Sequence, residues 1–110
     1  MEEEIARSRK VMGAGHAQMM ADLKEIEDGL AEGLRRGLPP QATALDKMLE
    51  RHRNWVAAAW GRECTPEAYA GLADVYEHPD FRKRFEQIQP GFADYLVTAM
   101  RAWARRQNPD

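Results

Sequence analysis

The sequence predicts a single all-α domain. Every periodic segment repeats its apolar residues at the three- and four-residue spacing of a helix, and no run alternates apolar and polar residues over the length of a strand. The length of 110 residues suits one hydrophobic core. No run of apolar residues is long enough for a membrane span, and the single cysteine leaves no internal disulfide. We therefore expect a cytoplasmic protein without membrane contact.

The first predicted helix covers about residues 16–33. A shorter helix over residues 2–12 precedes it, and we expect a break at Gly13–Gly15 because glycine weakens a helix. Its apolar stripe consists of Met19, Met20, Leu23, Ile26 and Leu30, and the acidic residues off that stripe are Asp22, Glu25, Asp28 and Glu32.

A second helix is predicted from about residue 40, after the prolines of the GLPPQ loop, to residue 60, where Gly61 stops it. The next helix begins at Thr65, a typical N-cap, followed by Pro66 in the first turn. A short helix follows His78-Pro79-Asp80, and the last covers about residues 90–105. Its apolar stripe consists of Phe92, Tyr95, Leu96, Ala99, Met100 and Trp103.

Aromatic residues are distributed unevenly along the chain. All nine lie between Trp55 and Trp103. Residues 1–34 instead carry eight acidic and four basic groups, with flexible methionines at positions 12, 19 and 20. Because aromatic side chains bring the largest apolar area to a core, we expect a stable core over residues 39–106. Residues 1–38 would be a mobile helical segment of the same domain, able to act as a lid.

The residues with metal-binding or catalytic chemistry are scattered. No two of His16, His52, His78 and Cys64 have the spacing of ligands to one metal ion, and no glycine-rich phosphate loop is present. We therefore expect no metal, no cofactor and no catalytic residue. The net charge is −2, and acidic residues are interleaved with the basic clusters. This pattern favours solvated helix faces over contact with nucleic acid.

Two residues keep two interpretations each. His52 lies on an apolar stripe, so it is either a partly buried histidine that donates to a backbone carbonyl or a polar contact in a ligand pocket. Cys64 precedes a helix N-terminus, whose dipole favours the reactive thiolate. Glu63 opposes that effect and Arg62 supports it, so an inert, half-buried thiol is the other interpretation.

Four segments in the same order resemble the TipAS antibiotic-recognition domain, an effector-binding module of some MerR-family transcription regulators. They are HRNW at residues 52–55, CTPEAYAGLADVY at 64–76, HPDF at 78–81 and PGFADYL at 90–96. The resemblance implies a globin-like fold and a cleft in which a cysteine adds to a dehydroalanine of thiopeptide antibiotics. It also implies N-terminal helices that close over the ligand. A winged-helix region is absent from the chain, so we expect either a fragment of a regulator or a short free-standing form.

Our first hypothesis is a non-enzymatic receptor for bulky apolar antibiotics or related small molecules, which would contact DNA only through an attached domain. Cys64 would be the covalent anchor if one is used, and His52 a polar contact. The expected ligand-binding residues are His52, Trp55, Trp60, Cys64, Tyr69, Tyr76, Phe92 and Tyr95. The alternative is a protein interaction module whose hydrophobic groove takes a partner helix.

Overall fold

Five α-helices and one short 3-10 helix make up the chain in the computed structural model, which describes the backbone of residues 2–107 and the side chains of residues 15–107. The elements are α1 (Glu2–Arg35), η1 (Thr43–Leu45), α2 (Asp46–Trp60), α3 (Pro66–Tyr76), α4 (Pro79–Ile88) and α5 (Phe92–Gln107). These residues contain no strand, so the all-α prediction is confirmed. None of the described helices is both long and apolar enough to span a bilayer.

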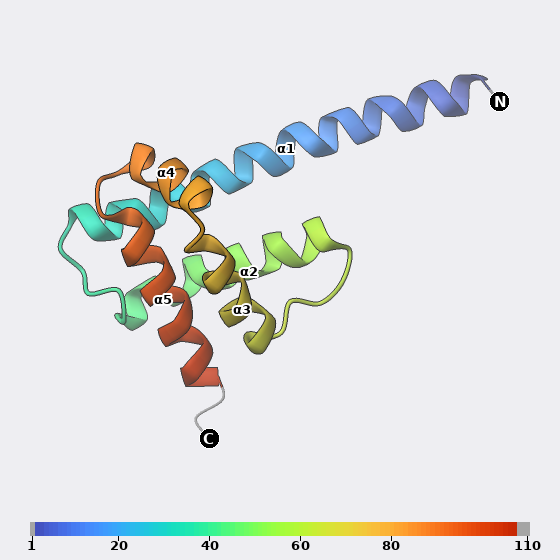
Figure 1. Cartoon of the computed structure of the whole chain (residues 1–110). Coiled ribbons are helices and arrows are strands. Elements are labelled where there is room, and N and C mark those ends of the chain that lie inside the picture. The colour runs from blue at the N-terminus through green and yellow to red at the C-terminus, as the bar shows by residue number, and fades with distance from the viewer. Residues whose placement is uncertain (1, 108–110) are drawn as a thin grey trace.

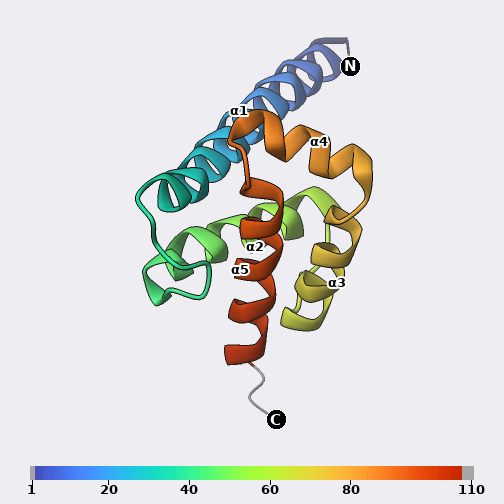
Figure 2. The same cartoon turned by 60° about the vertical axis from the view of Figure 1, so that its left-hand side comes forward.

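Helix α1 is one continuous helix, and the predicted break at Gly13–Gly15 is wrong. A glycine inside a helix costs roughly 0.5–1 kcal/mol relative to alanine, which is not enough to interrupt a helix with good helix formers on both sides. The first half of α1 projects away from the other helices, and its second half lies against them (Figures 1 and 2). The side chain of Met12 lies outside the described residues.

The starts and ends of the other helices follow local signals. The Thr65 side chain accepts a hydrogen bond from the Ala68 amide at 3.1 Å, so the predicted N-cap of α3 is confirmed. Gly61 ends α2 as predicted, with a φ of 69°. Helix α2 begins later than predicted, because Ala42 closes a turn on the carbonyl of Pro39 and the 3-10 helix η1 follows.

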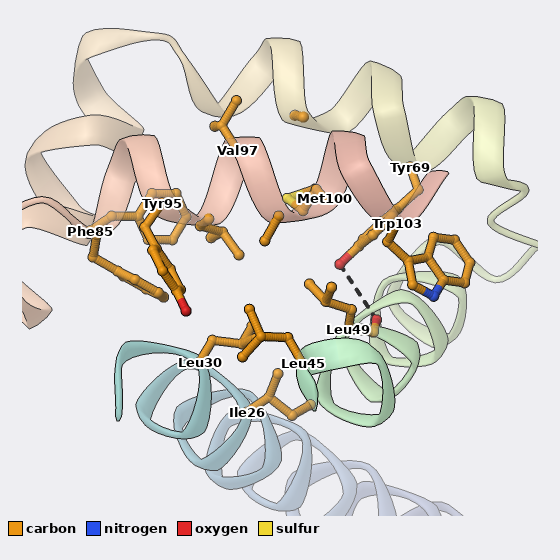
Figure 3. Packing of buried hydrophobic residues seen from close by; sticks show 14 of the residues in the cluster. Ile26, Leu30, Leu45, Leu49, Tyr69, Phe85, Tyr95, Val97, Met100 and Trp103 are labelled. Carbon is orange, nitrogen blue, oxygen red and sulfur yellow. Dashed lines mark hydrogen bonds between the residues drawn. The ribbon is translucent and has the colours of Figure 1, made fainter. Parts of the chain in front are cut away.

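The core is built around α5. All six residues of its predicted apolar stripe are buried, against α3 on one side and α1 and α2 on the other. Figure 3 shows Ile26 and Leu30 of α1 in this core, opposite Tyr95 and Met100 of α5. The second half of α1 is therefore part of the same core as the aromatic helices. Met20, predicted to lie on the α1 stripe, is 46% exposed.

Candidate ligand-binding site

A buried chain of hydrogen bonds joins α2 to α3. The Nδ1 atom of His52 lies 2.8 Å from the Tyr69 hydroxyl, and its Nε2 atom lies 3.4 Å from the Tyr76 hydroxyl. Tyr69 also donates to the carbonyl of Leu49 at 3.4 Å. One assignment of protons satisfies all three bonds: His52 donates from Nδ1 to Tyr69 and accepts at Nε2 from Tyr76. His52 is fully buried, and its side-chain partners are two tyrosine hydroxyls, where one of the two interpretations expected a backbone carbonyl.

Burial also decides whether the three hydrogen-bonded side chains carry a charge. It lowers the pKa of His52 to about 4, and the nearby guanidinium of Arg84 adds to the effect. The pKa values of Tyr69 and Tyr76 are raised, mainly by the same desolvation. All three side chains are therefore neutral at pH 7. Their hydrogen bonds fix the imidazole and the two hydroxyl groups without placing a charge in the core.

An aromatic cluster extends from the hydrogen-bonded side chains to the protein surface. The ring of Tyr76 lies 4.9 Å from that of Phe85 and 5.2 Å from that of Phe81, measured between centroids. Phe81 is 37% exposed, whereas Phe85 is buried and contacts the ring of Phe92 at 5.9 Å. The cluster thus joins the predicted residues Tyr76 and Phe92 to a solvent-accessible aromatic face on α4.

An open groove of about 420 Å³ lies between α1 and α4. Its apolar lining comes from Met20 and Leu23 of α1 and Ile88 of α4. An ion pair between Glu27 of α1 and Arg84 of α4 lies in the same groove, with two hydrogen bonds of 2.7 and 2.8 Å. The groove therefore combines an apolar surface with a bidentate charged pair.

A second open groove, of about 340 Å³, lies on the α2 side of α1. Trp55 of α2 and Met19 of α1 line it, and the indole Nε1 atom of Trp55 donates to the Met19 carbonyl at 2.7 Å. A third groove, of about 350 Å³ between α3 and α5, contains none of the predicted residues. Trp55 is the one predicted ligand-binding residue that lines any of these three grooves.

Cys64 is fully buried in the loop between α2 and α3. Its backbone carbonyl accepts a hydrogen bond of 2.9 Å from Arg53. Desolvation raises the pKa of the thiol, and this outweighs the lowering by Arg53 and Arg62. In this conformation the thiol is therefore protonated at pH 7 and shielded from solvent, and it is more deeply buried than the half-buried thiol of the inert interpretation.

The structure brings together only part of the predicted set. His52, Tyr69 and Tyr76 form one network, while Tyr95 is buried with its hydroxyl next to Gly33 of α1. Trp60, at the end of α2, is 38% exposed and stacks under the guanidinium of Arg62. Among residues with described side chains, no group of three or more histidine, cysteine or acidic residues could hold a metal ion.

Sequence reasoning missed the charged pair in the groove between α1 and α4. Glu27 directly follows the buried Ile26, so the sequence places it beside the apolar stripe. Its partner Arg84 lies 57 positions away. No local pattern identifies such a partner.

The arrangement is that of a small all-α domain, whose first helix is bordered by two grooves. The chain belongs to the TipAS antibiotic-recognition domain family, which matches residues 1–103. It is 42% identical over 90 residues to the HTH-type transcriptional regulator SkgA from Caulobacter vibrioides, in strains NA1000 / CB15N and ATCC 19089 / CIP 103742 / CB 15. The match covers 81% of this chain and 35% of each relative, so the chain spans about a third of their length. No solved structure matches the chain significantly.

Proposed function

We propose that this chain is the effector-binding domain of a MerR-type transcription regulator and binds bulky, largely apolar small molecules such as antibiotics. Membership of the TipAS family and the similarity to regulators named HTH-type support this proposal. DNA would be bound by a separate domain of the regulator. A form without such a domain would sequester the antibiotic instead. In both cases the protein would bind its ligand without catalysing a reaction of it.

The observation that carries the proposal is the position of α1 between two grooves. Met19 and Ile26 line the groove shared with α2, and Met20 and Leu23 line the groove shared with α4. A ligand in either groove would contact α1 and a helix of the core at the same time. Its binding energy would therefore depend directly on where α1 lies.

We further propose that the part of α1 before Leu23 responds to the ligand. Ile26, Leu30 and Ala31 are buried in the core, so the later part of the helix is anchored. The earlier part projects from the other helices (Figure 1). Ordering of this part over a bound ligand would convert occupancy into a signal along the helix.

The eight predicted ligand-binding residues take different parts in this proposal. Trp55 lines a groove and would contact the ligand directly. His52, Tyr69, Phe92 and Tyr95 are buried, so they would contact the ligand after a movement of α1 and otherwise support the groove walls. Tyr76 is partly accessible. Trp60 is exposed but lines none of the three grooves, so a ligand held in a groove beside α1 would not touch it. Covalent capture by Cys64 would require its loop to open.

Amide hydrogen exchange tests the proposal directly. A panel of apolar antibiotics, including a dehydroalanine-containing thiopeptide, is first screened by thermal shift, and exchange is then measured with each binder. We expect slower amide exchange in residues 2–22 with each binder, and recovery of every ligand that forms no adduct with Cys64 at its original mass. As matched variants, Trp55→Ala should weaken binding and Trp60→Ala, outside the grooves, should not. Unchanged exchange with a proven binder would contradict the ordering step, and a panel without binders would contradict the receptor.

A further inference from the structure

The ion pair between Glu27 and Arg84 has one buried and one accessible member. The side chain of Glu27 is 7% exposed, whereas that of Arg84 is 44% exposed. Withdrawing a carboxylate from water without a cationic partner is very costly, while a guanidinium already near solvent can return to water at little cost. Arg84 is therefore the exchangeable partner, and Glu27 is the fixed one.

The surroundings favour a cation at this position. The Arg84 guanidinium lies over the ring of Phe85, 5.1 Å from its centroid, so an aromatic face already accepts positive charge there. The charged residues that line the groove are Lys24, Glu27, Asp28 and Arg84, two positive and two negative. With Arg84 displaced to solvent, the remaining lining has one excess negative charge.

From this geometry we infer that the groove between α1 and α4 is a binding site for planar, lipophilic cations of the amidinium or guanidinium type. Such a ligand would replace Arg84 on Glu27 through two parallel hydrogen bonds, as Arg84 does now at 2.7 and 2.8 Å. Its apolar body would lie on Met20, Leu23 and Ile88. The groove volume of about 420 Å³ falls within the range of small-molecule sites.

An anionic ligand is disfavoured by the same argument. It would have to draw Arg84 away from Glu27, which would leave a buried carboxylate unpaired next to a second negative charge. The inference rests on the proposed function in placing the ligand against α1, and it adds the chemical class that this groove selects.

Three biphenyl compounds of similar shape test the inference on the full chain by isothermal titration calorimetry. They are biphenyl-4-carboxamidine, which is a cation, biphenyl-4-carboxamide, which is neutral, and biphenyl-4-carboxylate. We expect the amidinium to bind about tenfold or more tightly than the amide, because a charge-assisted bidentate pair replaces a neutral contact. Glu27→Gln should abolish this preference. Asp28→Asn, which removes an exposed carboxylate from the same groove, should keep most of it.

The variant Arg84→Gln gives an independent test that does not require Glu27→Gln to fold. It removes the competing cation, so the amidinium should bind more tightly and raise the melting temperature further than in the wild-type chain. Equal affinity for amidinium and amide, tighter binding of the carboxylate, or unchanged or weaker amidinium binding in Arg84→Gln would overturn the inference. Slower amide exchange in residues 2–22 with a neutral antibiotic would still support the receptor function. A failure of the cation site can therefore be told apart from a failure of the receptor function.

Discussion

The imidazole of His52 is held 2.8 Å from the Tyr69 hydroxyl in a site with no access to solvent. Because burial lowers the pKa of His52 from its ordinary 6.5 to about 4, the folded protein keeps this side chain neutral where the unfolded chain protonates it. The contribution to stability is complete above pH 6.5 and is lost progressively as the pH falls toward 4.

We therefore expect the free energy of unfolding to fall by about 2 kcal/mol between pH 7 and pH 5 because of this one group. Urea denaturation at several pH values measures this loss. His52→Gln should flatten the dependence over this range, whatever its effect on stability at pH 7. His16→Gln changes an exposed histidine and should keep the wild-type profile. A His52→Gln profile as steep as that of the wild-type chain would show that other groups cause the loss.

Gly33 lets α1 approach the core closely. A Cβ atom at this position would lie 2.9 Å from both the Leu45 side chain and the Tyr95 hydroxyl, which are buried and cannot easily move. Overpacking of this kind costs roughly 1–3 kcal/mol, and alanine regains at most about 1 kcal/mol of helix propensity. We expect Gly33→Ala to reduce the free energy of unfolding by about 1–2 kcal/mol.

Gly29 provides the matched control one turn earlier. A Cβ atom there would meet the tip of the Met48 side chain, which is flexible and only partly buried. We expect Gly29→Ala to be neutral or to stabilise by up to about 1 kcal/mol. Urea denaturation of both variants checks the pair, and equal losses would contradict the assigned difference between a rigid and a flexible neighbour.

Trp55 holds α1 near the point where that helix leaves the core. Its indole donates to the carbonyl of Met19, which also accepts the helical hydrogen bond from the amide four residues further on. Trp55→Phe keeps most of the apolar ring and removes the donor, at a cost of about 1 kcal/mol. Amide exchange before Leu23 should become roughly fivefold faster. Trp60→Phe, outside the three grooves, should leave this exchange rate unchanged. An equal increase in both variants would show that the Trp55–Met19 hydrogen bond does not specifically hold α1.

Local chemistry explains which parts of this structure could be predicted. The N-cap at Thr65 and the stop at Gly61 depend on a few neighbouring residues, and both are confirmed. The continuity of α1 depends on a balance of about 1 kcal/mol per glycine, which composition does not decide. The pairing of Glu27 with Arg84 and of His52 with two tyrosines depends on how distant helices pack, so neither could be identified from spacing.

Cys64 is the single cysteine of the chain, so the covalent mechanism that the family resemblance suggests would need its thiol to react with the ligand. It is buried, and burial raises its pKa, so both access and the thiolate fraction are low in the folded protein. We expect iodoacetamide at pH 7.5 to label Cys64 at least about tenfold more slowly in the folded chain than in urea. Intact-mass spectrometry over time measures both rates.

The same measurement decides whether Cys64 can serve as an anchor. A thiopeptide that uses this cysteine should form an adduct of the combined mass, and the adduct should disappear in Cys64→Ala while reversible binding remains. A non-covalent apolar ligand bound in the groove beside Trp55 should leave the slow iodoacetamide rate unchanged, because that groove does not include the loop that carries Cys64. Rapid labelling of the folded, ligand-free chain would contradict the buried thiol. An adduct formed equally by Cys64→Ala would exclude this residue as the anchor.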